Sequence, residues 1–508
     1  MISFIIALCA LLVGYLIYGR VIEKIFGPDD RETPAKAMAD GVDFVALPNW
    51  KIFMIQFLNI AGTGPIFGAI MGAWYGPSAY LWIVLGSIFA GAVHDYMTGM
   101  ISMRNKGAEL PEIVGLYLGK KTQKVVVVFS LITVIMVGVV FVFSPAVILA
   151  NLWGSRVMWV AIIFLYYILA TLLPIDKVIA RIYPIFAFSL LFMALALMAV
   201  LFIKMPDLPE IWSNLSDANK NVNPAWLDRE GLISSNPLFP CMFITIACGA
   251  ISGFHATQTP LMARCLVSER QGRPIFYGAM ITEGVVALIW ATVSMYFFYY
   301  GGWREVCPPE VVNAFIEQVD GGKNLRQFFE APAVVNYICT GWLGLFGGIL
   351  ALFGVVAAPI TSGDTAFRSA RLIIADHFHI NQTKVHNRML VGLPLFLASF
   401  FLLLWQINDS NGFNIIWQYF GLANQTISVF TLWTFTVYFV QQRKPFIQTL
   451  IPALFMTAVT TTFLFISKQG LGLPHTIAYS LGAVVLVIAL VWFFSWYRKA
   501  TKSLNTTE

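Results

Sequence analysis

Two hydrophobic segments of this chain are interrupted in the same way. The first, at 56–68, reads QFLNIAGTGPIFG, and the second, at 247–260, reads ACGAISGFHATQTP. Each places glycine, proline and hydroxyl residues inside an apolar run long enough to span a membrane. Because a bilayer offers the backbone no water, an opened helix persists there only where its freed polar groups find partners. Paired interruptions of this kind indicate the binding site of a transporter.

The composition places most of the chain in lipid. Of its 508 residues, 58% are hydrophobic and 11% are charged, whereas a soluble domain carries about 25% charged residues. A spanning helix needs about 20 mostly apolar residues. The sequence therefore predicts an all-α polytopic membrane protein with about 13 spans, at roughly 3–26, 50–73, 77–101, 125–150, 157–174, 181–204, 238–262, 276–300, 334–362, 389–407, 413–440, 447–467 and 475–497.

The distribution of Lys and Arg predicts the orientation. Most of the 32 basic residues fall in one set of connecting segments, which includes the tail at 498–502. Because such residues favour the cytoplasmic side, we expect an outer N-terminus and an inner C-terminus. The segment at 3–26 is too long for a signal-peptide core and is expected to remain as a helix. The net charge of +6 follows from this bias and requires no nucleic-acid partner.

The two interruptions occupy matching places in a repeat. Five predicted helices fill 50–204 and five more fill 238–440, and each set begins with an interrupted helix. Because five is odd, the second set enters the membrane from the opposite side. The sequence thus predicts a LeuT-like five-plus-five inverted repeat with two broken helices. We expect one transmembrane domain over 1–508, with 3–26 before the repeat and 447–497 after it.

Several long stretches resemble the carbon starvation protein A (CstA) family. They are GTGPIFGAIMGAWYGP (62–77), FAGAVHDYMTGMISMRNKG (89–107), FHATQTPLMARC (254–265), GRPIFYGAMITEGVVALIWAT (272–292) and VVAAPITSGDTAFRSARLIIAD (355–376). The resemblance covers about 40–440. It implies a secondary transporter of the bacterial inner membrane, linked to starvation and to uptake of peptides or pyruvate. It also implies proton coupling.

Residues at the interruptions are candidates for binding the solute. The half-helix that begins near Pro65 would direct its positive N-terminal dipole at an anionic group. His255 would bind a carboxylate or relay a proton, or it would be a neutral histidine bonded to opened backbone. The substrate-binding candidates are Gly62, Thr63, Gly64, Pro65, Ser252, Gly253, His255, Thr257 and Gln258.

Two carboxylates within predicted spans are candidates for proton coupling. An ionisable side chain at the centre of a spanning helix costs about 3 kcal/mol on insertion scales, so its presence needs a reason. Asp95 follows His94, and adjacent helical residues point about 100° apart, so we expect these two not to share one partner. Glu283 would carry a proton or form a buried ion pair. Asp95 would carry a proton or anchor to Arg104.

A further polar group follows Pro359, at the predicted end of the eighth repeat helix. Three alternatives remain open there. Na⁺ would bind the hydroxyls together with carbonyls freed near the first interruption; Asp364 would take a proton; or Asp364 would cap the helix and pair with Arg368. The residues concerned are Thr361, Ser362 and Asp364. In the Na⁺ alternative, the carbonyl oxygen of Ala61 would be a further ligand of the ion.

These features favour a secondary active transporter that imports a small carboxylate or a short peptide by alternating access. The coupling ion is H⁺ or Na⁺, and no other cofactor is expected. A membrane sensor that binds the solute without moving it is the alternative. The chain has no HExxH, nucleophile-elbow or Walker motif, so we do not expect an enzyme. The sequence decides neither the solute, nor the ion, nor the oligomeric state.

Overall fold

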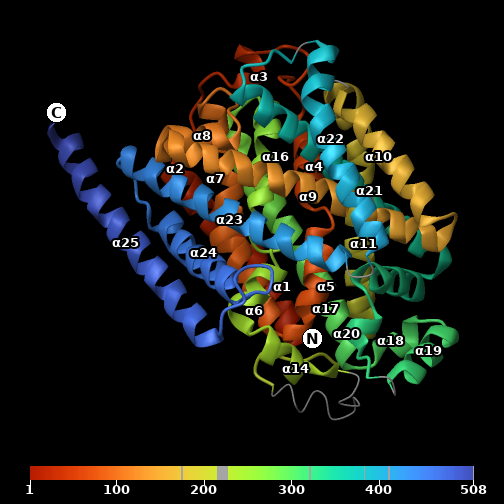
Figure 1. Ribbon diagram of the computed structural model, residues 1–508. Coiled ribbons are helices and arrows are strands. Elements are labelled where there is room, and N and C mark those ends of the chain that lie inside the picture. Colours follow the sequence, from red (N-terminus) through yellow and green to blue (C-terminus); the bar gives the residue numbers. More distant parts are fainter. Residues whose placement is uncertain (173–174, 214–226, 320–321, 383, 410–411, 507–508) are drawn as a thin grey trace.

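A computed structural model describes residues 1–172, 175–213, 227–319, 322–382, 384–409 and 412–506 of the chain. Within these ranges the secondary structure is helical and contains no strand. The helices form one elongated bundle, with α3 (Pro34–Ala37) at its upper end and α14 (Arg229–Ser235) at its lower end in Figure 1. We call these the α3 end and the α14 end.

Nine helices of the described chain are long and apolar enough to cross a membrane. They are built from α1 (Ile2–Leu16) with α2 (Tyr18–Phe26), α6 (Ser78–Gly86) with α7 (Ala92–Arg104), α9 (Lys120–Leu152), α11 (Ile175–Lys204), α17 (Gly278–Tyr299), α21 (Ala331–His377), α22 (Val385–Asn408), α24 (Ile447–Ile466) and α25 (His475–Thr506). Helices α4 (Asn49–Ile60) and α5 (Gly64–Gly72) belong to a bent pair that raises the number to ten.

The remaining predicted spans take other forms. The run at 157–174 forms α10 (Arg156–Leu172), which falls short of spanning length within the described residues. The run at 413–440 forms one long helix, α23 (Gly412–Gln441), which is not among the nine. The run at 238–262 is divided into short helical pieces. The total of 13 spans therefore stays a prediction.

The boundary predicted for the span at 334–362 is wrong. Helical structure continues to His377, and its apolar spanning part is Gly347–His377. The change of direction lies at Gly344, whose φ of 66° and ψ of −173° are not helical. Hydrophobicity continues across this glycine, so the apolar pattern alone does not show where the straight part of the helix begins.

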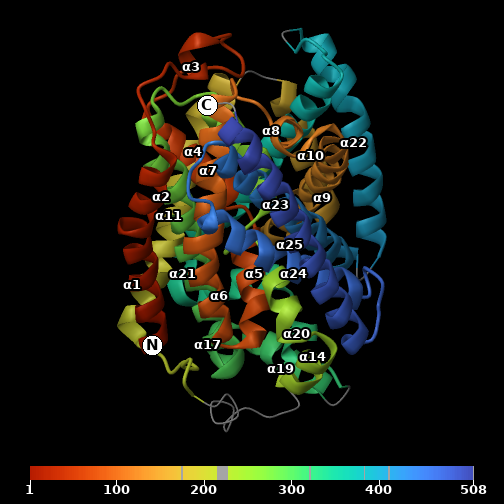
Figure 2. The same ribbon diagram turned by 90° about the vertical axis from the view of Figure 1, so that its left-hand side faces the viewer.

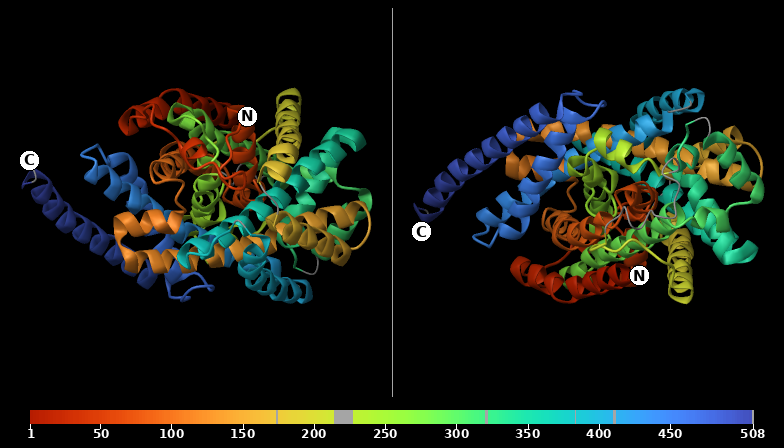
Figure 3. Two further views of the ribbon diagram at one scale, coloured as in Figure 1. Left: turned by 90° about the horizontal axis from the view of Figure 1, so that it is seen from above. Right: turned by 90° about the horizontal axis from the view of Figure 1, so that it is seen from below.

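The termini lie at opposite ends of the bundle. Residue 1 lies at the α14 end, and α25 rises along one edge toward the α3 end (Figures 1 and 2). Seen along the bundle, α25 extends outward at one side while α1 packs at another (Figure 3). The connection at 301–333 contains α18 (Gly302–Val306), α19 (Pro309–Val319) and α20 (Leu325–Phe328) at the α14 end. The middle of the loop at 204–237 lies outside the described residues.

Both interrupted segments are broken. The axes of Asn49–Ile60 and Gly64–Tyr75 differ by 44° across the first break. The second segment has helical turns at Leu238–Met242 and in α15 (Phe243–Thr245), then non-helical backbone at 246–252, and then α16 (Gly253–Ala263).

The two broken segments run in opposite directions. At the α3 end, the backbone N–H of Leu47, just before α4, donates to the carbonyl of Cys265, just after α16, at 3.2 Å. At the α14 end, the Tyr75 hydroxyl donates to the carbonyl of Asn236 at 3.3 Å. The start of each segment therefore lies beside the end of the other (Figure 2).

Gly91, between α6 and α7, allows the backbone of the second break to approach closely. A Cβ added at Gly91 would lie 2.2 Å from the carbonyl oxygen of Ala250, which is fixed backbone. A Cβ added at Gly278 in α17 would have its nearest neighbours at 3.5 Å or more, which is ordinary contact.

We therefore expect Gly91→Ala to destabilise the fold by about 1–3 kcal/mol, the usual cost of overpacking, while Gly278→Ala is tolerated. Thermal unfolding of the two purified variants in one detergent measures the difference. Equal midpoints for both variants would show that the approach of Ala250 to Gly91 is not a constraint.

Candidate functional site

The first break frees backbone groups that a neighbouring helix satisfies. The α-helix ends at Ile60, and Ala61 leaves helical geometry at φ −82° and ψ 49°. The carbonyl of Leu58 then accepts a hydrogen bond from Ser362 Oγ in α21, at 2.9 Å. Thr365 Oγ1 of the same helix lies 3.3 Å from Asn59 Oδ1. Helix α21 thus supplies hydroxyls at this break, where one of the three alternatives for the group after Pro359 places them.

The second break is held from one side by the region around α6. Trp82 Nε1 donates to the carbonyl of Ile246 at 2.9 Å, and Ser87 Oγ donates to the carbonyl of Gly249 at 3.0 Å. Both carbonyls belong to the non-helical stretch, where they lack helical partners. These bonds remove the cost of leaving backbone oxygens unpaired in an apolar setting.

Helix α23 holds the same break from another side. Asn424 Oδ1 accepts from the backbone N–H of Phe254 at 2.6 Å and from Ser252 Oγ at 3.1 Å. Gln425 Nε2 donates to the carbonyl of Ile251 at 2.9 Å. These two amides therefore bind the backbone at the second break.

The two breaks lie against each other. A Cβ on Gly64 would approach Cys248 Sγ to 2.4 Å, and a Cβ on Gly68 would approach the carbonyl oxygen of Thr245 to 2.9 Å. Gly62 meets the ring of Phe141 from α9 in the same way, at 2.8 Å. Small residues here therefore allow the two broken segments and α9 to meet within the bundle.

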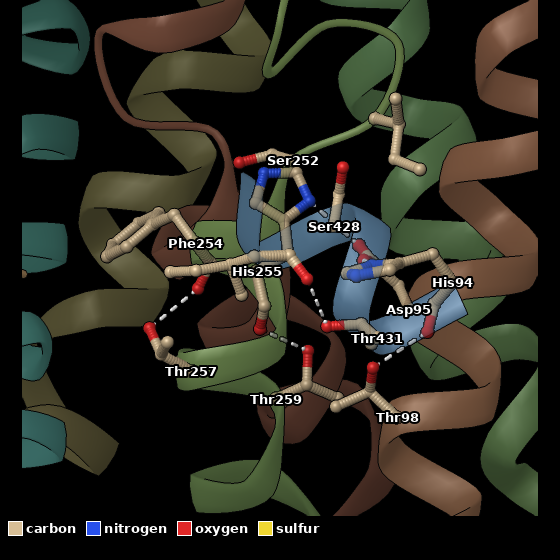
Figure 4. A network of polar contacts seen from close by, with 12 residues as sticks. His94, Asp95, Thr98, Ser252, Phe254, His255, Thr257, Thr259, Ser428 and Thr431 are labelled. Carbon is tan, nitrogen blue, oxygen red and sulfur yellow. Dashed lines mark hydrogen bonds and ion pairs between the residues drawn. The ribbon is translucent and has the colours of Figure 1, made fainter. Parts of the chain in front are cut away.

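His255, in the first turn of α16, lies between two carboxylates. Its Nδ1 is 3.0 Å from Asp95 Oδ2 in α7, and its Nε2 is 3.5 Å from Glu283 Oε2 in α17. The other oxygen of Asp95 lies 2.9 Å from His94 Nδ1. All four side chains have no solvent exposure. Figure 4 shows His94, Asp95 and His255 facing one another across the two helices. We call these four residues the His–Asp–His–Glu cluster.

The contacts of Asp95 within this cluster decide between its alternatives. Its carboxylate bridges His94 and His255. A carboxylate has two oxygens, so it can accept bonds from two directions at once. Asp95 does not anchor to Arg104, because Arg104 pairs with Glu269 at 2.9 Å near the α3 end.

The predicted residues on α21 lie in the middle of the helix and not at its end, which corrects the sequence interpretation. The helix continues through Pro359, whose carbonyl accepts from the Tyr167 hydroxyl at 3.0 Å. Thr361 Oγ1 donates to the carbonyl of Ala358 in its own helix, at 2.8 Å. Asp364 Oδ2 accepts from the Tyr183 hydroxyl of α11 at 2.6 Å. A cap at a helix end is therefore excluded as the role of Asp364.

Two more of the predicted residues, Thr257 and Gln258, make hydrogen bonds within α16. Thr257 Oγ1 donates to the carbonyl of Phe254 at 2.7 Å, and Gln258 Nε2 donates to Thr257 Oγ1 at 2.9 Å. Gln258 Oε1 and Thr63 Oγ1 are buried without a hydrogen-bond partner among the described residues. Polar atoms in native interiors usually bond to protein or ordered water, so these two atoms have bonding capacity left for a further molecule.

The chemistry of the donors limits the metals that this region suits. Among the described residues, no group of three or more His, Cys, Asp and Glu is placed to hold a metal ion. Near the first break the available ligands are hard oxygens, the Ser362 hydroxyl and the Leu58 carbonyl, which suit a hard cation. Thr361 is close in sequence, but its hydroxyl bonds to its own helix.

A cavity of about 530 Å³ opens at the α3 end. Its walls come from the start of α8 (Leu110–Leu118), the start of α9 and the end of α21, and they include Glu109 and Asp376. The predicted site residues do not line it. Thr63, Ser252 and His255 at the breaks are fully buried, so access to them requires movement of the broken segments.

Sequence reasoning missed Trp82, Ser87 and Tyr183. Each is an ordinary residue of an apolar helix, and no local motif marks it. Their importance comes from the opened backbone and the carboxylate that they contact across the bundle, which is information about tertiary contacts.

This arrangement of antiparallel broken helices around a buried polar cluster is that of a membrane transporter. The family model described as "Carbon starvation protein CstA" matches residues 1–152, 143–321 and 333–463. The chain therefore belongs to the carbon starvation protein CstA family.

Relatives in other bacteria agree with this family. An uncharacterized membrane protein of Haemophilus influenzae is 44% identical over 59% of this chain and 91% of that protein. Proteins named peptide transporter CstA are 28% identical in Campylobacter jejuni, over 89% of this chain and 78% of theirs, and 26% identical in Bacillus subtilis, over 96% and 94%.

Two solved transporters share the fold. A manganese transporter of Eremococcus coleocola aligns with a TM-score of 0.55 at 11% identity, covering 92% of this chain and 99% of that one. A Na⁺-coupled sialic acid symporter in a substrate-bound outward-open state aligns with a TM-score of 0.55 at 13% identity, covering 95% and 96%. At these identities the likeness concerns the fold alone.

Asn424 offers a test of how the second break is maintained. We expect Asn424→Ala to leave the buried N–H of Phe254 without its acceptor and to destabilise the protein by roughly 1–3 kcal/mol. Thr426→Ala is the matched control on α23, because the Thr426 hydroxyl bonds to Leu422 in its own helix. Thermal unfolding of both variants is the measurement, and a loss no larger in Asn424→Ala would contradict this role.

Proposed function

We propose that this chain is a secondary active transporter that imports a short peptide, or a small pyruvate-like carboxylate, by alternating access with H⁺ as the coupling ion. The names of the CstA relatives support a peptide. Both solutes carry a carboxylate. We propose no catalytic residue, and we connect the import activity with nutrient starvation, as the family's name suggests.

We further propose that the chain is a five-plus-five inverted repeat of the LeuT type over 50–204 and 238–440, within a bundle of 13 spans. The opposite directions of the two broken segments support the repeat. The excess of basic residues at the α3 end supports its assignment to the cytoplasm. In that orientation the N-terminus is outside, the C-terminus is inside, and the protein lies in the bacterial inner membrane.

The His–Asp–His–Glu cluster is the observation that carries the proposal of proton coupling. A proton on His255 attracts both Asp95 and Glu283, whereas without it two buried carboxylates face a neutral ring. His255 also lies in the first turn after the second break. Gain or loss of one proton therefore changes the forces on the half-helix that must move for alternating access.

We place the solute where the breaks meet. The N-terminus of α5 begins there with Gly64 and Pro65, and its dipole favours a carboxylate. Thr63 Oγ1 and Gln258 Oε1 lack hydrogen-bond partners among the described residues. A bound peptide offers both a carboxylate for the dipole and amide N–H groups for the acceptor atom of Gln258.

One contact favours Na⁺ as the second candidate for the coupling ion. Ser362 Oγ donates a hydrogen bond to the Leu58 carbonyl, which the first break leaves without a helical partner. A hydroxyl of α21 and a carbonyl of α4 are thereby brought together, and Na⁺ between them would join the two elements. In this alternative Asp364, bonded to Tyr183, has a supporting role.

We expect uptake of a labelled dipeptide such as dialanine into proteoliposomes to be driven by an imposed pH gradient, acid outside, and not by a Na⁺ gradient. Asp95→Asn should lower pH-driven uptake by at least about tenfold, because it removes one charged partner of His255, and a factor of ten corresponds to roughly 1.4 kcal/mol. Labelled pyruvate in parallel distinguishes the two solute classes.

Thr98→Ala is the matched control on α7, because the Thr98 hydroxyl bonds to the carbonyl of His94 in its own helix. Wild-type uptake by Asp95→Asn would remove the cluster from the coupling mechanism. Uptake driven by Na⁺ alone would favour the alternative ion. Saturable solute binding without any uptake would indicate a sensor in place of a transporter.

A further inference from the structure

Helix α21 carries a line of buried polar residues that leads from the first break to the α3 end. Ser362, Thr365, Arg368 and Arg371 follow one another at intervals of three residues. Each such step turns about 60° around an α-helix, so the line winds around α21 as it approaches the α3 end, and we call this winding line the polar face. All four side chains have no solvent exposure. The face thus begins at the proposed solute site and ends in two buried guanidinium groups.

This face contacts both broken segments. Ser362 and Thr365 contact the last turn of α4 through the Leu58 carbonyl and the Asn59 side chain. Ser369, next to Arg368, donates to the carbonyl of Thr257 in α16 at 2.5 Å. A solute that leaves the breaks toward the α3 end between these segments therefore moves along this face.

Asp43 lies against both arginines at the end of the face. Its Oδ1 is 3.6 Å from Arg368 Nη1 and 3.9 Å from Arg371 Nη2, and the Asp43 side chain is 7% exposed. These distances exceed a hydrogen bond, and Oδ1 has no hydrogen-bond partner among the described residues. The carboxylate of Asp43 therefore compensates the arginine charges without bonding to them.

Hydrogen bonds of its own segment also fix the position of Asp43. The N–H of Asp43 donates to Asp40 Oδ1 at 3.0 Å, and the N–H of Leu47 donates to the Cys265 carbonyl. Both bonds tie the segment that precedes α4 in place. The carboxylate of Asp43 therefore stays farther from the two guanidinium groups than hydrogen-bond distance.

Arg371 retains N–H groups that are able to bind an anion. Arg371 donates from Nη1 to Gln382 Oε1 at 2.5 Å, whereas its Nε and Nη2 have no hydrogen-bond partner among the described residues. Arg388, 3% exposed, donates to the carbonyl of the same Gln382. A guanidinium fork bonds carboxylates in a two-pronged geometry, and leaving its buried N–H groups unbonded is costly.

We propose that Arg368 and Arg371 form a carboxylate-binding site on the exit path of the transporter, which Asp43 occupies while that path is closed. The departing solute's carboxylate replaces Asp43 there, and the segment that precedes α4 moves aside. The inference rests on the proposed transport function for its role, but the site itself is tested without transport.

The direct test is chemical rescue of Asp43→Ala, which removes the internal carboxylate. Formate should raise the midpoint of thermal unfolding of this variant in purified form, increasing with the logarithm of its concentration as a ligand of the folded state does. Formamide, a neutral molecule of similar shape, should not, and neither should chloride at equal ionic strength.

Wild type and Glu32→Ala, which removes an exposed acid from the same segment, are the matched controls and should show no rescue. The double variant Asp43→Ala/Arg371→Gln should lose it. Equal effects of formate and formamide, or no effect of formate on a monodisperse Asp43→Ala protein, would overturn the site.

A transport measurement then tests its place on the path. Arg371→Gln should slow efflux of preloaded solute from proteoliposomes several-fold, and Arg371→Lys should restore part of the rate. Wild-type efflux in Arg371→Gln would overturn the exit role. If wild-type protein moves no solute at all, the proposed function fails, while formate rescue of Asp43→Ala still reports on the site.

Discussion

Backbone polar groups that a broken helix exposes within lipid must be bonded, and the rest of this structure depends on how that is done. The second break opens 246–252, and side chains of Trp82, Ser87, Asn424 and Gln425 bond to its carbonyls and N–H groups. The first break is bonded by Ser362 of α21. Each opened backbone is therefore maintained by other helices, and changes in those helices are transmitted to it.

The same constraint explains why charge lies beside the breaks. His255 begins the half-helix after the second break and lies between two carboxylates of α7 and α17. Along α21, the polar face that begins at the first break winds around the helix to the arginines beside Asp43. Under the proposed mechanism, a proton at one break and a carboxylate at the end of the path from the other act on the two broken segments.

Much of the site could be predicted from the sequence because its signals are local. Gly, Pro and hydroxyl residues within apolar runs mark the breaks, and isolated ionisable residues such as His255 and Glu283 are conspicuous in apolar surroundings. Contacts between distant segments could not be predicted. Asp43 belongs to a polar connection, and nothing in its neighbourhood indicates that it faces α21. The end of α21 was misplaced because Pro359 does not stop the helix, and the real change of direction lies at Gly344.

The central claim is that solute and proton cross together. It is tested most directly with a pH-sensitive dye sealed inside proteoliposomes in Na⁺-free buffer with no imposed gradient. On addition of external dialanine, the account predicts acidification of the lumen that follows entry of the labelled dipeptide in time. Entry of the dipeptide with no change in lumenal pH would contradict it.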